Sequence, residues 1–252
     1  MTCGAIFPRA DDGGVNMLTT VLFDLDGTLL PMDQDAFVQA YFRRLAGKVA
    51  PLGYEPKALI DAVWAGTKAM VQNDGSRTNE QAFWDCFARI YGPERLADRP
   101  VFDEFYRVEF QQVGADCGFA PEAVEVVAAL RGKGLTLALA TNPIFPAVAT
   151  CSRIRWAGLA PEDFALYTTY ENSTHCKPNP AYYADVLRML GREAGECLMV
   201  GNDVEEDMIA RSLGMRVFLL TDCLINRPGA DISAWPHGSF DALVRYVEEI
   251  CA

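Results

Sequence analysis

The chain has 252 residues, of which 50% are hydrophobic and 22% are charged, so it can bury a sizeable core without disulfides or a structural metal. Its formal net charge of −12 argues against a nucleic-acid or anionic-membrane partner, because either would need a basic face. No run approaches the roughly 18 apolar residues that span a bilayer.

Residues 1–16 are expected to form a loose N-terminal extension. They lack the apolar stretch of a signal peptide and contain two acidic residues followed by two glycines. Met17 stands directly before the first predicted strand, so Met1 and Met17 are both open as the start of the protein. The eight cysteines form no CxxC pair, and several lie in apolar runs, which favours reduced thiols in a cytoplasmic protein.

Five short apolar runs predict the buried strands of a parallel sheet. In chain order they are 19–23, 135–140, 164–168, 197–200 and 217–220. Helical patterns with proline near the start or glycine after the end lie between the later runs, at 121–131, 180–190 and 205–213. Strand and helix alternate from about residue 119 onward, which predicts a doubly wound α/β fold.

Residues 33–116 break that alternation. They contain four helical stretches separated by turn residues and no convincing strand; the stretches are 35–49, 56–72, 79–90 and 101–113. We therefore predict an α/β core of residues 17–32 and 117–252, with 33–116 as a smaller, all-helical insertion.

Three of the apolar runs end in reactive polar residues. These pairs are Asp24 with Asp26, Thr141 with Asn142, and Asn202 with Asp203. The carboxyl ends of parallel strands share one edge of a sheet, and ligands bind there. Pairs more than a hundred residues apart in sequence are thus expected to meet in one site.

That site would also hold the carboxylate of Asp207. Four carboxylates gathered in a partly desolvated site need raised pKa values or a compensating cation. Because the ligands are all oxygen, with no histidine or cysteine among them, Mg²⁺ is the cofactor that they favour.

The same residues resemble the motifs of the haloacid dehalogenase (HAD) superfamily. Asp24-Leu25-Asp26-Gly27-Thr28 is similar to the DxDGT signature, and Ala140-Thr141-Asn142 to the second motif. Lys177-Pro178 followed by Pro180 is similar to the third, and Gly201-Asn202-Asp203 with Asp207 to the fourth, acidic one. All four occur in the family's order between residues 19 and about 222. The insertion stands where many members carry a helical cap.

The resemblance implies a Mg²⁺-dependent phosphohydrolase that acts on a small phosphorylated molecule. Asp24 would be the nucleophile that takes the phosphoryl group, and Asp26 the general acid and base. Thr141, Asn142 and Lys177 would bind the phosphate. The metal would be held by Asp24, the backbone oxygen of Asp26, and Asp203, with Asp207 and Asn202 in support.

Several alternatives stay open on the sequence. A phosphoglucomutase-like phosphotransferase, a hydrolase of pyrophosphate bonds and a catalytically silent binding protein share these motifs. A receiver-type signalling domain is disfavoured, because its lysine would follow the acidic motif. Asp26 argues against a dehalogenase, since carbon–halogen cleavage has no leaving oxygen to protonate.

Several further residues lie outside the four motifs and have no role that the resemblance implies. Within the insertion, Trp64, Lys68, Arg77 and Trp84 are conceivable substrate contacts, although such aromatic residues usually form core and such basic residues are usually solvated. His175 is read as a loop histidine, and Glu205 and Glu206 as the acidic first turn of a helix. The oligomeric state and the identity of the substrate are not determined by the sequence.

Overall fold

The computed structural model describes residues 17–251; the expected extension of residues 1–16 lies outside this range. Six parallel strands form one sheet in the order β3-β2-β1-β4-β5-β6. They are β1 (Thr20–Phe23), β2 (Thr136–Leu139), β3 (Leu166–Tyr167), β4 (Cys197–Gly201), β5 (Arg216–Leu220) and β6 (His237–Gly238). The doubly wound parallel sheet expected from the sequence is confirmed.

The central strand β1 lies between β2 and β4, which brings three distant parts of the sequence together. Phe23 at its end is in register with Leu139 of β2 and Val200 of β4. The residues that follow these three positions therefore emerge side by side at the carboxyl edge of the sheet.

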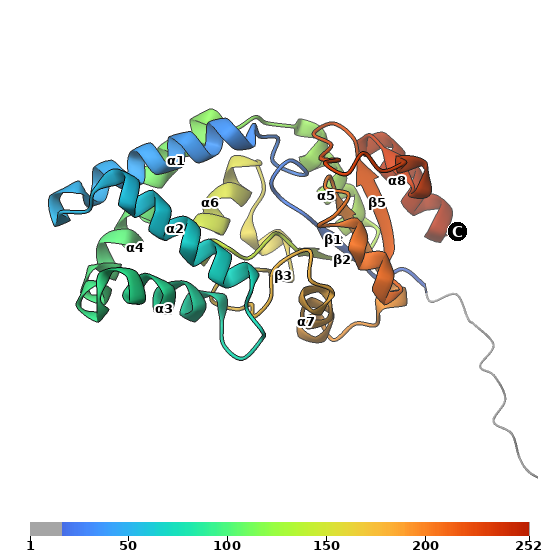
Figure 1. Cartoon of the computed structure of the whole chain (residues 1–252). Coiled ribbons are helices and arrows are strands. Elements are labelled where there is room, and N and C mark those ends of the chain that lie inside the picture. Colours follow the sequence, from blue (N-terminus) through green and yellow to red (C-terminus); the bar gives the residue numbers. More distant parts are fainter. Residues whose placement is uncertain (1–16, 252) are drawn as a thin grey trace, which may run out of the picture.

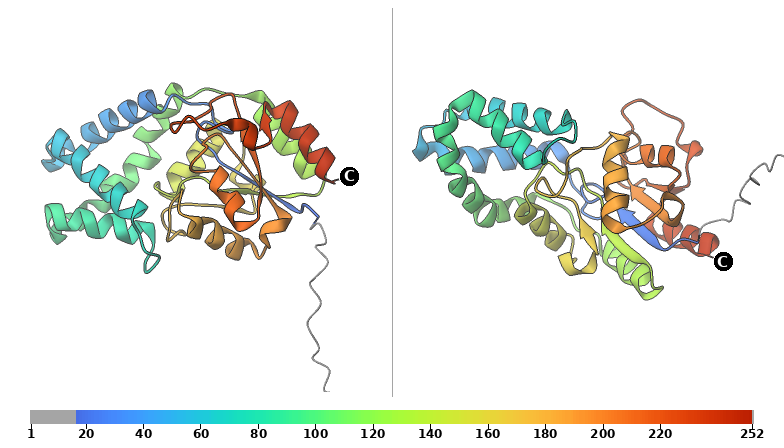
Figure 2. Two further views of the ribbon diagram at one scale, coloured as in Figure 1. Left: turned by 45° about the vertical axis from the view of Figure 1, so that its right-hand side comes forward. Right: turned by 90° about the horizontal axis from the view of Figure 1, so that it is seen from below.

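Helices cover both faces of the sheet (Figures 1 and 2). Val21 and Phe23 point to the face where helices α5 (Pro121–Gly132) and α8 (Phe240–Cys251) pack. The intervening Leu22 points to the other face, against α7 (Pro180–Leu190) and the 3₁₀ helix Met208–Leu213. This alternation explains why the strands are apolar throughout.

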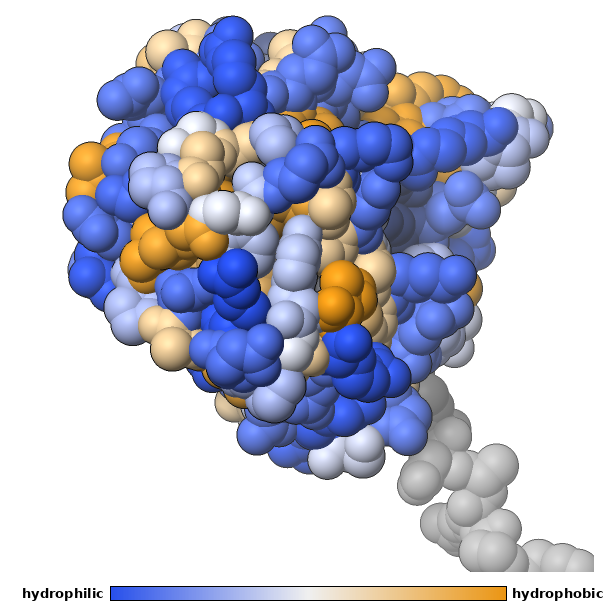
Figure 3. Space-filling model, turned by 60° about the vertical axis from the view of Figure 1, so that its left-hand side comes forward, coloured by the Kyte–Doolittle hydropathy of each residue, from blue (hydrophilic) through white to orange (hydrophobic). Residues whose placement is uncertain are grey.

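The inserted segment between β1 and α5 contains helices and a second hydrophobic core, and it lies to one side of the sheet (Figure 1). Its α helices are α1 (Gln34–Val49), α2 (Pro56–Val71), α3 (Asn79–Tyr91) and α4 (Arg99–Arg107), with 3₁₀ turns between and after them. The side chains of Asp33, Glu55 and Thr78 accept backbone N–H groups and fix the starts of α1, α2 and α3. Figure 3 shows this side of the molecule as largely hydrophilic, with small separate hydrophobic patches.

The second core is not confined to the inserted segment. Helix α6 (Ala147–Trp156), which follows β2, packs against α4 and the 3₁₀ helix Glu109–Asp116. It contributes Ala149 to the same hydrophobic cluster. The division into a core and an insertion at residues 33–116 therefore stays a prediction.

Asn79, at the start of α3, joins the inserted segment to the loops of the core and is fully buried. Its side-chain amide lies 3.2 Å from the carbonyl oxygen of Pro143 and 3.3 Å from that of His175. Its backbone N–H donates to Ser173 O, and the next N–H donates to Tyr170 O, both at 2.8 Å.

Two expectations about single helices are wrong. The helix expected over 101–113 ends at Arg107 and continues as the 3₁₀ helix Glu109–Asp116, in which Phe110 and Val113 are fully buried. The helix expected over 205–213 is a 3₁₀ helix from Met208 only, because Asp203 holds the residues before it in a turn. Helices α6 and α8 and strand β6 were not expected at all.

Two further findings concern possible membrane-spanning helices and the cysteines. Within residues 17–251, no helix is long and apolar enough to cross a membrane. The seven cysteines in this range are all free.

Candidate active site

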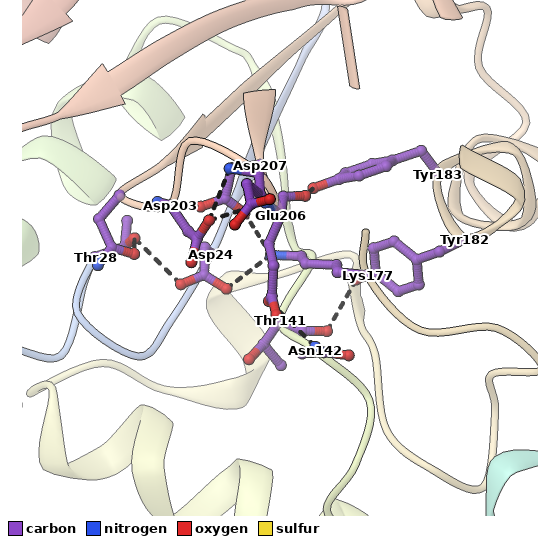
Figure 4. A network of polar contacts seen from close by, with 12 residues as sticks. Asp24, Thr28, Thr141, Asn142, Lys177, Tyr182, Tyr183, Asp203, Glu206 and Asp207 are labelled. Carbon is purple, nitrogen blue, oxygen red and sulfur yellow. Dashed lines mark hydrogen bonds and ion pairs between the residues drawn. The ribbon is translucent and has the colours of Figure 1, made fainter. Parts of the chain in front are cut away.

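Asp24 is the first residue after β1 and lies at the carboxyl edge of the sheet (Figure 4). Its backbone N–H donates to Val200 O of the neighbouring strand at 2.9 Å. Its Oδ1 accepts a hydrogen bond from Lys177 Nζ at 2.8 Å, and its Oδ2 lies 3.2 Å from Thr28 Oγ1. The nucleophile expected from the sequence is therefore a buried carboxylate with one oxygen bonded to Lys177 and the other next to Thr28.

The turn after Asp24 depends on Gly27. This residue has φ +84°, and a Cβ here would overlap the side chain of Asn202. The hydroxyl of Thr28 lies 3.0 Å from Asn202 Oδ1 as well as near Asp24, and with one hydrogen it can donate to only one of them at a time. Asn202 thus supports the turn that carries Asp24.

Lys177 lies behind Asp24, on the loop before α7, and is almost completely buried. Its Nζ also donates to Asp207 Oδ1 at 2.7 Å. Burial by itself would lower the pKa of Lys177, but the carboxylates of Asp207 and Asp24 outweigh it and raise the pKa well above its usual value. Lys177 is therefore a fixed positive charge beneath the nucleophile.

The acidic motif after β4 forms a tight turn. Asp203 Oδ1 accepts the backbone N–H groups of Glu205 and Glu206, at 2.8 and 3.0 Å. Asp207 Oδ2 accepts the N–H of Asp203 at 2.9 Å, so its two oxygens connect Lys177 to this turn. Burial raises the pKa of Asp207 to about 6, against the opposing effect of Lys177.

Glu206 corrects an expectation from the sequence. It is not in the first turn of a helix but in the turn before the 3₁₀ helix, and it lines the same cavity as Asp24, where its carboxylate accepts a hydrogen bond from Asn142 Nδ2 at 3.1 Å. Burial raises its pKa to about 7; Lys177 opposes this rise, and the nearby aspartates add to it. No sequence signal distinguishes Glu206 from Glu205, because only the turn made by Asp203 decides which one faces inward.

Asp26 pairs with a residue that the sequence reasoning missed. Its carboxylate forms an ion pair with the buried guanidinium of Arg153, on α6, while its Oδ1 has no hydrogen-bond partner among residues 17–251. Burial raises the pKa of Asp26, and Arg153 works against that rise. A carboxyl group with a raised pKa suits an acid that must give up a proton.

Thr141 and Asn142 follow β2 and complete the cavity. The Thr141 carbonyl oxygen accepts hydrogen bonds from Tyr182 Oη at 2.9 Å and from Thr168 Oγ1 at 2.6 Å, which fixes this loop over α7. The cavity has a volume of about 240 Å³, and the predicted residues that line it are Asp24, Asp26, Thr141, Asn142, Asn202, Asp203 and Asp207. The structure thus brings all the predicted site residues together, with Lys177 directly behind Asp24.

The donor set fits a divalent cation. Five carboxylates meet here, of Asp24, Asp26, Asp203, Glu206 and Asp207, and three of them have raised pKa values. Residues 17–251 contain no group of three histidine, cysteine or acidic side chains already arranged around one point. Two carboxylates with one backbone oxygen and water, the set expected from the sequence, would satisfy Mg²⁺ without such a group.

The other residues considered from the sequence divide into two groups. Trp64 lines the cavity that holds Asp24, and both Trp64 and Trp84 line a second cavity next to it. Arg77 instead pairs with Asp85 on the exposed surface, and His175 bonds to Asp185 at 2.8 Å. Arg227 was not anticipated; its Nη1 lies 3.5 Å from Asp203 Oδ2, at the rim of the cavity.

Known proteins match this chain in sequence over most of its length. The sequence model of the haloacid dehalogenase-like hydrolases matches residues 18–213. A phosphoglycolate phosphatase of Rhodospirillum rubrum is 27% identical over 86% of each chain. A ribulose-1,5-bisphosphate 5-phosphatase of Halopiger xanaduensis is 26% identical over 81% of this chain and 84% of its own.

The fold is also that of a solved structure. The 2-haloacid dehalogenase of Pseudomonas syringae superposes with a TM-score of 0.61 at 23% identity, over 91% of this chain and all of the other. At this level of identity the likeness concerns the fold alone.

Proposed function

This chain belongs to the haloacid dehalogenase-like hydrolase family and is a phosphatase, and we propose that it hydrolyses a small-molecule phosphate monoester through a phosphorylated Asp24. The observation that carries the proposal is the Asp24 carboxylate, held by Lys177 and next to Thr28, with Asp26 two residues away in the same cavity.

In the first step, an Asp24 oxygen attacks phosphorus and the bond from phosphorus to the ester oxygen breaks. Asp26 gives its proton to the departing oxygen, so that the alcohol leaves neutral. A water molecule then attacks the phosphorus, Asp26 takes up its proton, and the bond to Asp24 breaks, releasing inorganic phosphate. Lys177 offsets the negative charge on Asp24 and on the phosphoryl group, while Thr141 and Asn142 bind phosphoryl oxygens.

We propose Mg²⁺ as the cofactor, bound by Asp24, the backbone oxygen of Asp26, and Asp203. Bound there, it would offset the charge of the phosphate and of the surrounding carboxylates. Asp207 orients Lys177 and the acidic turn, and Asn202 orients Thr28.

Residues 33–116 act as a cap in this proposal. Phe37, Val38 and Trp64 of this segment line the cavity together with Asp24. Side chains of the segment therefore shield the reacting groups from water and contact the part of the substrate that leaves.

The test is phosphate release from p-nitrophenyl phosphate, with Mg²⁺ and with EDTA. We expect turnover with Mg²⁺ only, and a loss of at least about 10³-fold in Asp24→Asn, because the amide is not a nucleophile. Asp61→Asn, which changes an exposed aspartate paired with Lys57, is the matched control and should keep full activity. Substantial turnover by Asp24→Asn would refute the mechanism.

A further inference from the structure

A second cavity adjoins the one that holds Asp24. It lies among the helices of the inserted segment and has a volume of about 110 Å³. Both cavities are lined by Phe37, Val38, Trp64, Ile144 and Phe145. The second cavity therefore begins where the phosphoryl site ends.

This second cavity is aromatic. Ten of its sixteen lining residues are Phe, Tyr or Trp, and four more are aliphatic. The remaining two are Thr67 and Asp103, so the lining includes one acid and neither lysine, arginine nor histidine. An anionic group placed there would lose its hydration, find no cation among these residues, and face the carboxylate of Asp103.

Phe145 connects the two cavities. The guanidinium carbon of Arg153, the partner of Asp26, lies 4.6 Å from the centre of its ring. The same ring meets Phe37 and Tyr41 edge-on, with centroids 6.1 and 5.7 Å apart. The guanidinium that pairs with the proposed general acid therefore lies over a ring that lines both cavities.

We infer that the second cavity binds the leaving group, and that the preferred substrates are phosphate monoesters of alcohols that carry an aromatic ring close to the ester oxygen. The inference rests on the proposed phosphatase function and names its substrate class. An apolar cavity of roughly 150 Å³ is known to take up benzene, so a single ring is of the right order of size. Aromatic walls favour an aromatic guest over an aliphatic one, because edge-to-face contacts add to the burial of area.

A preference for an aromatic leaving group would distinguish this chain from the phosphatases that resemble it in sequence. Phosphoglycolate carries a carboxylate and ribulose bisphosphate a second phosphate, and each such group calls for a cation where the leaving group binds. The lining of the second cavity offers none.

The experiment compares kcat/KM for benzyl phosphate, ethyl phosphate, cyclohexylmethyl phosphate and 2-phosphoglycolate, with Mg²⁺ present. All four esters release a primary alcohol. We expect kcat/KM for benzyl phosphate to be at least about tenfold higher than for ethyl phosphate and 2-phosphoglycolate. It should also be higher than kcat/KM for cyclohexylmethyl phosphate, but by a smaller factor. A benzyl-to-ethyl ratio near one, or a preference for 2-phosphoglycolate, would overturn the inference.

Two matched variants assign the preference to the cavity. Trp64 is 49% exposed at the boundary of the two cavities, so Trp64→Ala leaves the core intact and should lower the benzyl-to-ethyl ratio about tenfold. Ile90 is equally exposed, at 49%, and lines neither cavity, so Ile90→Ala should leave the ratio unchanged. Equal benzyl-to-ethyl ratios in the two variants would show that Trp64 and its cavity do not determine the preference for the benzyl ester.

A binding measurement separates this inference from the proposed function. Calorimetry with benzylphosphonate and methylphosphonate, which cannot be hydrolysed, should show tighter binding of the benzyl compound, weakened by Trp64→Ala. Such binding without turnover of any ester would refute the hydrolase and keep the aromatic cavity. Turnover without a benzyl preference in either measurement would support the hydrolase and refute the aromatic cavity as a binding site. If the protein showed no binding and no turnover, both proposals would be refuted.

Discussion

The buried ammonium group of Lys177 determines how the acids around it behave. It contacts Asp24 and Asp207 at 2.8 and 2.7 Å, and both of these carboxylates are thereby held next to a charge that does not titrate near neutral pH. Glu206 lines the same cavity but makes its hydrogen bond to a neutral amide, that of Asn142. It is the acid with the pKa of about 7, which leaves it protonated at a pH where most glutamates are charged.

This difference predicts a pH-dependent stability in the protein without metal. The pKa of Glu206 in the folded state, about 7, lies above its ordinary value of 4.5, so the folded state keeps a proton that the unfolded state has already lost. The contribution is fully present below pH 4.5 and is lost as the pH rises through 7. Glu206→Gln should remove it, making the variant more stable relative to wild type at pH 8 than at pH 5.

Urea unfolding in EDTA at several pH values measures this change. Each pKa unit corresponds to about 1.4 kcal/mol, so the change across the range is a few kcal/mol at most. Glu205→Gln, at the exposed neighbouring position, is the control and should parallel wild type. A Glu206→Gln curve that also parallels wild type would show that Glu206 ionises normally.

At the scale of elements, the site depends on turns that follow strands. Gly201 ends β4, and a Cβ there would overlap the carboxylate of Asp207. The close approach lets Asp207 reach both Lys177 and the N–H of Asp203. The absence of a side chain at Gly201 therefore leaves room for the Asp207 carboxylate, which in turn holds Lys177 and the turn at Asp203.

Gly201→Ala should accordingly lose both stability and activity. Overpacking of this kind costs about 1–3 kcal/mol of the free energy of unfolding, and the displaced Asp207 should lower kcat for p-nitrophenyl phosphate at least about tenfold. Gly47→Ala in α1 is the control, because within residues 17–251 its Cβ would meet no atom within 4 Å outside its own stretch of helix. That substitution should be neutral or stabilise the protein by up to about 1 kcal/mol, since alanine favours a helix. Normal unfolding and kinetics for Gly201→Ala would contradict this role.

The sequence was informative where the chemistry is local and less so where it depends on packing. Buried strands showed as apolar runs, and the residues after them could be assigned to one edge of the sheet. Arg153 was missed because α6 has no clear apolar period and its partner Asp26 is 127 positions away. Helix α8 does carry an apolar face in its sequence, formed by Phe240, Leu243 and Val247, but no motif accompanies it. The inward turn of Glu206 could not be foreseen, since it depends on hydrogen bonds that exist only in the fold.

At the scale of the whole molecule, the hydrophobic cluster of the inserted helices is joined to the cluster on the α5 and α8 face of the sheet. Helix α6 packs on the inserted helices, and its Ile154 belongs to the cluster at the sheet. On another side, Asn79 is bound to the loops that follow β2 and β3. The inserted segment is therefore attached by buried contacts as well as by its two chain crossings.

Asn79→Ala should weaken this attachment. It leaves buried carbonyl groups unsatisfied, at a cost of about 1–3 kcal/mol in the free energy of unfolding. Hydrogen exchange should speed up most at the backbone amides of positions 79 and 80, which donate to the carbonyl oxygens of Ser173 and Tyr170. Asn179→Ala, which removes a local cap of α7, should leave those two amides protected. Unchanged exchange in Asn79→Ala would mean that other contacts hold the segment.

The Asn79 attachment bears on how such enzymes diversify. An exchange of residues 33–116 with the equivalent helices of a relative would cut through the contacts between Asn79 and residues 170–176. The foreign helices would then meet a loop shaped for a different partner. A chimaera designed to accept a new substrate should therefore take the 170–176 loop from the same relative as its helices. The two exchanged segments are far apart in sequence although they are in contact in the fold.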